Sequence, residues 1–145
     1  MDWGLAGNYV ARIVAAYALA LPIGLNRERE AHTVGIRTFP IVAMASCGFV
    51  MLGATTPDTQ SRIIQGLIAG IGFVGGGAIL KNPAGSVQGT ATAASIWNTG
   101  AIGAAVAMGR FEIAIALAFM NWVSLWLLLP VKTRLDAGLD KKEIR

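Results

Sequence analysis

Hydrophobic residues are concentrated in five long runs that are separated by short polar segments. The runs cover approximately residues 5–25, 39–56, 63–80, 91–108 and 113–129, and the last run stops at Pro130. A helix that crosses the hydrocarbon core of a bilayer needs about 20 mostly apolar residues, and each run comes close to that length. The pattern predicts an all-α, polytopic membrane protein with five transmembrane helices.

The third and fourth runs are rich in glycine and alanine rather than leucine. Six of the eighteen residues at 63–80 are glycine, with GxxxG spacing at Gly66/Gly70 and at Gly72/Gly76. Small residues let helices approach closely in lipid, so we expect tight packing between these two spans, on faces that also suit a homodimer. A second interpretation stays open, in which the glycines at 75–77 break the helix and expose backbone carbonyls, as in transporters. Packing is the interpretation that we favour.

The composition agrees with a membrane location. Of the 145 residues, 54% are hydrophobic and only 14% are charged, whereas soluble domains carry roughly 25% charged residues. This balance excludes a disordered chain and argues against a soluble enzyme. We expect one transmembrane domain over residues 1–130 and a basic cytoplasmic tail over 131–145. The net charge of +4 then reflects basic cytoplasmic loops and not binding to nucleic acid.

The basic residues predict the orientation, because Lys and Arg concentrate in cytoplasmic loops. With five spans, nine of the twelve basic residues fall on one side: Arg27, Arg29, Arg37, Lys81, Lys132, Arg134, Lys141, Lys142 and Arg145. We therefore expect the N-terminus outside and the C-terminus in the cytoplasm. Residues 1–11 contain no Lys or Arg, which a signal peptide would carry, so we expect the first run to remain as a span.

Arg12 is the one ionised side chain well inside a predicted span. It lies about two turns, or roughly 10 Å, from the outer end of that span. Its long stem could carry the guanidinium to the lipid headgroups, which is the interpretation that we favour slightly. In the alternative, Arg12 faces the bundle and pairs with a carbonyl or an anionic group.

Carboxylates are confined to the edges of the predicted spans. Glu28 and Glu30 lie at the cytoplasmic edge, and Asp58 and Glu112 lie at the outer edge. Ion-coupled transporters commonly use carboxylates inside the membrane, and Mg²⁺ prefers carboxylate and water ligands, so the sequence gives little support to direct Mg²⁺ transport and names no metal ligands. We expect the neutral polar residues inside the spans to hydrogen-bond between helices; they are Ser46, Asn98, Thr99, Asn121 and Ser124.

The sequence contains no recognisable catalytic set, and we expect neither enzymatic activity nor a cofactor. His32, the single histidine, lies in a polar loop among Arg and Glu, and Cys47, the single cysteine, lies within the second run, where a thiol is usually inert. Residues 70–75 match the GxGxxG pattern. They lack the strand and the acidic residue of a dinucleotide site, so this match is empty.

The densest polar cluster lies between the first two runs, at residues 26–38. Arg27, Arg29 and Arg37 could bind lipid phosphates or an acidic partner. They could equally reflect only the membrane orientation and local ion pairs, and the sequence leaves these two interpretations open.

Three motifs, in order and with matched spacing, resemble those of the MgtC/SapB family of bacterial inner-membrane proteins. The first is Gly24-Leu25-Asn26-Arg27 followed by Gly35-Ile36-Arg37-Thr38. The second is Arg62-Ile63 followed by residues 70–77, Gly-Ile-Gly-Phe-Val-Gly-Gly-Gly. The third is residues 89–97, Gly-Thr-Ala-Thr-Ala-Ala-Ser-Ile-Trp, followed by Gly103. The family carries an acidic residue at the position of Asn26. Many members also carry a soluble C-terminal domain, for which the residues after 130 are too few.

The resemblance implies a multi-pass protein of the bacterial inner membrane that is linked to magnesium homeostasis. It implies action by binding or modulating other membrane proteins within the lipid bilayer; direct transport of Mg²⁺ or another small solute is the alternative. The implied interaction surface is the cytoplasmic-edge motif, which comprises Asn26, Arg27, Glu28, Gly35, Arg37 and Thr38. Behind it lie the glycine-rich span, with Gly70, Gly72, Gly75, Gly76 and Gly77, and the fourth-span motif, with Gly89, Thr92, Trp97 and Asn98.

Overall fold

The computed structural model describes residues 3–30, 34–54, 56–81 and 87–143, without the side chains of Glu30 and of residues 131–143. Five helices account for most of this part of the chain: α1 (Trp3–Glu30), α2 (Thr38–Leu52), α3 (Pro57–Gly76), α4 (Thr90–Ala107) and α5 (Phe111–Glu143). Two short strands, β1 (Leu80–Lys81) and β2 (Val87–Gln88), pair antiparallel between α3 and α4. The prediction of an all-α protein is confirmed.

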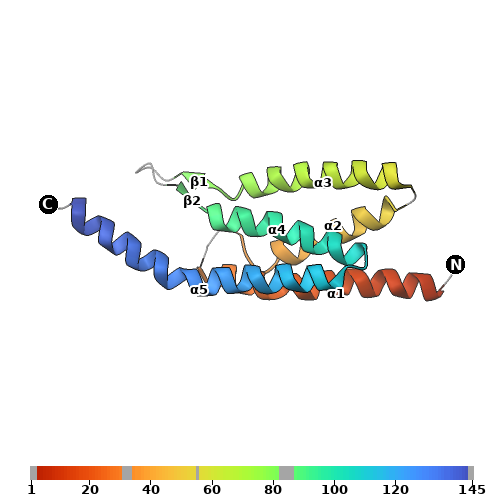
Figure 1. Cartoon of the computed structure of the whole chain (residues 1–145), viewed down its shortest axis with the longest axis horizontal. Helices are drawn as coiled ribbons and strands as arrows, with labels where there is room; N and C mark the ends of the chain where they lie inside the picture. Colours follow the sequence, from red (N-terminus) through yellow and green to blue (C-terminus); the bar gives the residue numbers. More distant parts are fainter. Residues whose placement is uncertain (1–2, 31–33, 55, 82–86, 144–145) are drawn as a thin grey trace.

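Each helix runs opposite to the helix before it in the chain (Figure 1). The C-terminal ends of α1, α3 and α5 therefore lie at one end of the bundle together with β1 and β2, and we call this the hairpin end. The N-terminus and the α2–α3 and α4–α5 connections lie at the other end, which we call the N-terminal end. This alternation is the arrangement expected of five consecutive spans.

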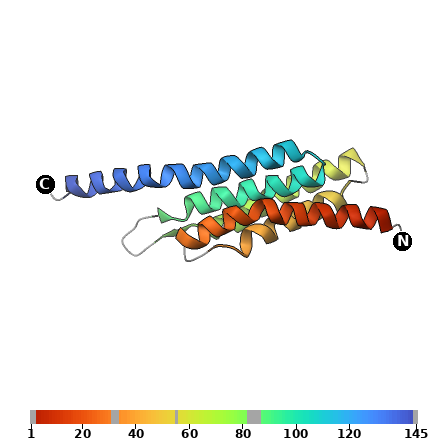
Figure 2. The same ribbon diagram turned by 90° about the horizontal axis from the view of Figure 1, so that it is seen from below.

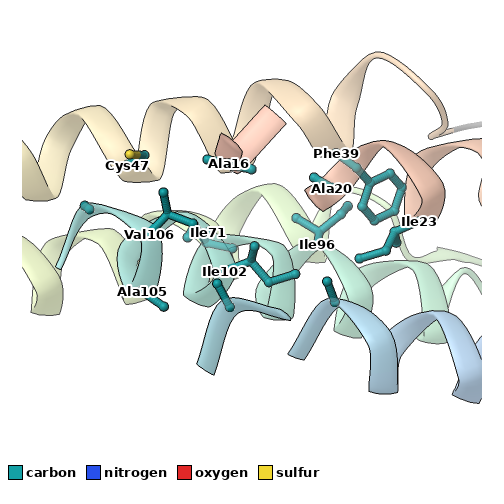
Figure 3. Packing of buried hydrophobic residues seen from close by; sticks show 14 of the residues in the cluster. Ala16, Ala20, Ile23, Phe39, Cys47, Ile71, Ile96, Ile102, Ala105 and Val106 are labelled. Carbon is teal, nitrogen blue, oxygen red and sulfur yellow. The ribbon is translucent and has the colours of Figure 1, made fainter. Parts of the chain in front are cut away.

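The central helix of the bundle is α4, which contacts each of the other four helices and lies between α1 and α5 (Figure 2). Ten of its residues are buried, and most of them are alanine, glycine, serine or threonine. Small side chains allow four neighbours to approach one helix closely. Larger residues fill the remaining space, and Figure 3 shows Ile23, Phe39 and Ile96 from three different helices pointing toward one another.

The third helix lies about one turn and a half earlier in the chain than the 63–80 run predicts. It begins at Pro57 because the Thr56 side chain accepts a hydrogen bond of 3.2 Å from the backbone N–H of Thr59, which caps the first turn. It ends at Gly76, before the chain enters β1. The glycine run at 75–77 therefore ends the helix, and residues 77–80 lie outside it.

The fifth helix continues through Pro130, where the apolar run stops, and ends only at Glu143. A proline inside a helix removes one backbone hydrogen bond and tends to bend the helix. The C-terminal part of α5 diverges from the bundle in Figure 1. Residues 131–143, predicted as a basic tail, are thus the helical continuation of the last span.

Among the described residues, two helical segments are long and apolar enough to cross a membrane by length and composition, namely Trp3–Arg29 and Phe111–Pro130. The apolar helix α2 is shorter, at 15 residues. The glycine-rich α3 and alanine-rich α4 have lower mean hydropathy per residue than a leucine-rich span would have. The arrangement of five antiparallel helices matches the prediction. By length and composition, α1 and α5 qualify as membrane-spanning helices.

Candidate functional site

The cytoplasmic-edge motif folds into a close contact between the end of α1 and the start of α2. The Glu28 carboxylate accepts a hydrogen bond of 2.9 Å from the backbone N–H of Ile36. A side chain at Gly24 would place its Cβ 3.1 Å from the Ile36 Cα, and one at Gly35 would overlap the Glu28 carboxylate. Both glycines permit this approach. Glu28 is therefore engaged by the backbone just before α2, where the helix dipole favours an anion.

The other residues of this motif differ in what they offer to a partner. The backbone N–H of Thr38 closes the turn before α2 by donating to the carbonyl three residues earlier, at 3.0 Å. Asn26 and Arg27 are half-buried, and the buried Oδ1 of Asn26 accepts no hydrogen bond. Arg29 and Arg37 are exposed. A partner at the hairpin end could reach these two arginines without disturbing the contact between α1 and α2.

The glycine-rich helix packs against α4 through a smaller set of glycines than its spacing suggests. A Cβ at Gly75 would lie 3.2 Å from the Ala93 carbonyl oxygen, so α3 and α4 approach closely there. At Gly66, Gly70, Gly72 and Gly76, a Cβ would meet nothing within 4 Å. The expected close packing of the third and fourth helices therefore depends on Gly75, and the four glycines of the GxxxG pairs take no part in it. Sequence spacing places residues on one face but does not say toward which neighbour that face turns.

The fourth-span motif mainly connects α4 to its neighbours. Asn98 donates a hydrogen bond of 3.3 Å to the Leu117 carbonyl oxygen, and the Ser95 hydroxyl donates one of 3.0 Å to Asn121 Oδ1. Both bonds join α4 to α5, as the sequence predicts for polar residues inside spans. Thr92 is buried.

Other polar side chains inside the helices bond to their own helix. Ser46, Thr99 and Ser124 each donate to the carbonyl four residues earlier, at 2.7–2.8 Å. The prediction of bonds between helices is therefore correct for Asn98 and Asn121 and wrong for these three. A hydroxyl on a short stem reaches its own helix more easily than the next one.

Two further motif residues have contrasting environments. Gly89 precedes α4 with a φ of +87°, and a Cβ there would overlap the Ala78 carbonyl oxygen. This position therefore needs glycine on two separate grounds, the left-handed backbone and the close approach. Trp97, in contrast, is 53% exposed, on the side of α4 that faces α3.

The transport alternative predicts a polar cavity lined by the backbone carbonyls near Gly75–Gly77 together with Asn98 and Thr99, and the contacts of these groups point in different directions. Thr99 donates to the Ser95 carbonyl of its own helix. Asn98 bonds to α5, whereas Gly75 packs against Ala93 on α3's side of α4. The hollow between α3 and α4, of about 110 Å³, is lined by apolar residues and glycine, among them Ile64, Ile71, Trp97 and Gly100. Among the described residues, the hollow between α3 and α4 therefore contains neither Asn98 nor Thr99.

A larger groove runs between α4 and α5 and has a volume of about 510 Å³. Its polar lining comprises Arg27, Ser95, Asn98, Asn121 and Ser124, and the rest is alanine, leucine and methionine. Arg27, three residues before the end of α1, places a positive charge at the hairpin end of the groove. The groove therefore carries a cation at one end and a mainly apolar lining with four neutral polar side chains along the rest.

Arg12 faces the bundle, which is the alternative that we favoured less from the sequence. Its Nε donates a hydrogen bond of 2.8 Å to Asn8 Oδ1, and its Nη1 donates one of 2.5 Å to the Ala107 carbonyl oxygen. Ala107 is the last residue of α4. Arg12 thus satisfies a terminal carbonyl and lies at the negative end of the α4 dipole.

The single cysteine lies in the core of the bundle. Cys47 is fully buried in the apolar core, and His32 lies outside the described residues. Within the part of the chain that the structure describes, no three His, Cys, Asp or Glu side chains gather as metal ligands would.

The sequence as a whole matches the model of the MgtC family over residues 13–134. The chain belongs to the MgtC family. The matched region contains all three motifs, so the family pattern falls on the α1–α2 contact, on the end of α3 and on the start of α4.

Individual MgtC-family relatives support this assignment. Protein SrpB of Synechococcus elongatus is 35% identical over 129 residues, which cover 79% of this chain and 71% of the relative. Protein MgtC of Salmonella typhimurium is 35% identical over 109 residues, which cover 74% of this chain and 47% of the relative. Protein SapB of Bacillus subtilis is 24% identical over 141 residues, covering 85% and 61%. The match thus spans about half the length of the Salmonella protein. No solved structure matches the chain.

Sequence reasoning assigned no packing role to two glycines of α4 that bring this MgtC-family bundle together, although Gly103 belongs to the third motif. A Cβ on Gly103 would overlap the Ala43 carbonyl oxygen and lie 2.8 Å from the Ser46 Cβ, and a Cβ on Gly100 would overlap the end of the Ile71 side chain. The available signal was the run of small residues over 91–108, which predicts a helix surrounded on several sides.

Proposed function

We propose that this MgtC-family protein is a five-span protein of the bacterial inner membrane, linked to magnesium homeostasis, which acts by binding and modulating other membrane proteins. It is non-enzymatic in this proposal. The hairpin end faces the cytoplasm, and the exposed arginines there contact the partner.

The exposed surface supports insertion of the whole bundle in the membrane. Large apolar side chains point outward from several helices, among them Trp3 at 78% exposure, Phe73 at 86% and Trp126 at 62%. All five helices expose large apolar side chains among their described residues, as expected of helices that are surrounded by lipid. Phe73 lies on α3, so this argument extends to a helix that the test of length and composition leaves out.

The observation that favours modulation over transport is the use made of the polar groups inside the bundle. Ser95, Asn98 and Asn121 hold α4 to α5, and Arg12 holds the end of α4. The oxygen atoms of Ser95 and Asn121 that take part in these bonds are poorly suited to replace the hydration shell of a passing ion. Asn121 Nδ2 is buried without a hydrogen-bond partner among the described residues, but an amide N–H group is a donor and does not coordinate a cation. Arg29 and Arg37, in contrast, are exposed at the hairpin end.

The experiment measures growth at limiting Mg²⁺ in a host that lacks its own copy of the gene. We expect the double variant Arg29→Gln/Arg37→Gln to reduce growth to the level of the empty host, with protein in the membrane at the wild-type amount. The matched control is Arg62→Gln/Arg110→Gln, which removes two charges at the N-terminal end, each in an exposed pair with Asp58 or Glu112. The control should grow like the wild type.

A flux measurement separates this proposal from the transport alternative. Purified, monodisperse protein in proteoliposomes should give no Mg²⁺ uptake above that of empty liposomes. Saturable uptake by the folded, inserted protein would establish transport and contradict the proposal.

The uncovered glycines of α3 are where a second copy of the chain would pack. Gly66 and Gly70 line an apolar groove between α2 and α3 of about 510 Å³, and GxxxG faces support close helix contacts in membranes. We expect the wild-type protein to be a dimer in mild detergent and the Gly70→Leu variant to be a monomer. Light scattering measures this difference. A wild-type protein that is monomeric at all concentrations would contradict it.

A further inference from the structure

The groove between α4 and α5 has the length of one membrane leaflet. Its lining extends along α5 from Leu117 to Leu129, which is about 18 Å at 1.5 Å per residue. Half of a bilayer hydrocarbon core is about 15 Å. In the proposed five-span arrangement, on which this inference rests, the groove runs from the cytoplasmic headgroup region to the middle of the membrane.

The chemistry of the groove changes along this length. Arg27 lies at the hairpin end, where Leu128 and Leu129 also line the groove, and Leu117 and Met120 line its deeper part. The groove exists because most of the side chains that α4 presents on this side are small: Ala91, Ala94 and Ser95, beside Asn98. The middle of the groove also carries Asn121 and Ser124 of α5. A cation at the headgroup level beside this mainly apolar groove complements an anionic headgroup with an attached hydrocarbon chain.

The charge at the hairpin end selects the occupant. Arg27 complements the phosphate of an anionic phospholipid, and a hydrocarbon chain, which is narrow and has no side chains, is compatible with the mainly apolar lining beside it. We propose that the α4–α5 groove holds one acyl chain of an anionic phospholipid of the cytoplasmic leaflet, with the Arg27 guanidinium bound to its phosphate.

The test uses the purified full chain in neutral detergent, with equal amounts of palmitoyl-oleoyl phosphatidylglycerol and phosphatidylcholine. Native mass spectrometry counts the lipids that remain bound. We expect about a tenfold preference for phosphatidylglycerol, because a charge-assisted bond from Arg27 to the phosphate region is stronger without a neutralising choline. Equal retention of both lipids would overturn the proposal.

Two variants separate the charge from the channel. Arg27→Gln should remove the preference for phosphatidylglycerol, whereas Arg29→Gln, nearby on α1 but outside the groove, should keep it. Ala94→Phe should fill the channel and remove the bound lipid with Arg27 intact. Its control is Ala101→Phe, on the side of α4 that faces α3. If Ala94→Phe retains as much lipid as the wild type, the lipid binds elsewhere on the surface and the groove site is contradicted. This variant tests the site even if Arg27→Gln does not fold.

A competition experiment distinguishes a lipid phosphate from free inorganic phosphate as the bound group. Excess inorganic phosphate should not displace phosphatidylglycerol, because the acyl chain supplies part of the binding. Displacement by inorganic phosphate would show a site for a free anion and overturn the lipid assignment. Since the assay involves no magnesium and no partner protein, its failure leaves the proposed function standing, and a failure of the growth experiment leaves the lipid result unchanged.

Discussion

Arg12 joins two segments that lie 95 residues apart in the sequence through a single hydrogen bond to the Ala107 carbonyl oxygen. Replacing it with leucine leaves that carbonyl without its donor and removes the positive charge from the negative end of α4. We expect Arg12→Leu to lower the free energy of unfolding by about 1.5–3 kcal/mol, the usual value for a hydrogen bond to a charged group. Denaturant unfolding in detergent micelles measures this change.

The control for Arg12 is Arg62, an arginine in a solvent-exposed ion pair. Arg62 pairs with Asp58 at 2.9 Å, and both side chains are more than 70% exposed. Arg62→Gln should therefore change the same free energy by less than about 1 kcal/mol. Equal effects of the two substitutions would show that the Arg12 guanidinium reaches the lipid headgroups instead. Its bond to α4 would then contribute nothing to the free energy of unfolding.

Between helices, the contact of α2 with α4 depends on Gly103. A methyl group there would overlap the Ala43 carbonyl oxygen, so Gly103→Ala forces the two helices apart. We expect a loss of about 1–3 kcal/mol in unfolding free energy, as for other overpacked sites. Gly48→Ala on α2 is the control, because a Cβ there meets nothing within 4 Å. It should leave stability unchanged or raise it by up to about 1 kcal/mol. A neutral Gly103→Ala would contradict the close approach.

For the whole molecule, the alternating helices allow the orientation to be tested at both ends. In a Cys47→Ala background, Arg37→Cys places a thiol at the hairpin end and Arg110→Cys places one at the N-terminal end, both at exposed positions. A membrane-impermeant maleimide should label Arg110→Cys on intact cells and label Arg37→Cys only after the cells are opened. The reverse pattern would overturn the proposed orientation, and labelling of both on intact cells would overturn the five-span arrangement.

The amino-acid sequence by itself determined the number and order of the helices and the family. Each apolar run is long enough that its backbone must bond internally in an apolar medium, which a helix achieves. The family motifs at Gly24, Gly70 and Gly89 could be recognised from the sequence because the spacing of glycines does not depend on what each glycine contacts. Polar residues such as Asn98 and Asn121 were correctly assigned to bonds between helices, since a lone amide inside an apolar run needs a partner.

Only the tertiary structure decided which neighbour each residue meets. The periodicity of a helix does not set its rotation about its axis relative to the bundle, so spacing could not show that Gly75 and Gly103 are covered while Gly70 is open. The ends of α3 depended on the cap at Thr56 and on the turn into β1. Arg12, Glu28 and Arg27 received their roles from groups brought close by folding: a carbonyl of α4, a backbone N–H before α2, and the groove beside α5. A contact between segments that are distant in the sequence depends on how the helices pack, so it cannot be predicted from a local sequence pattern.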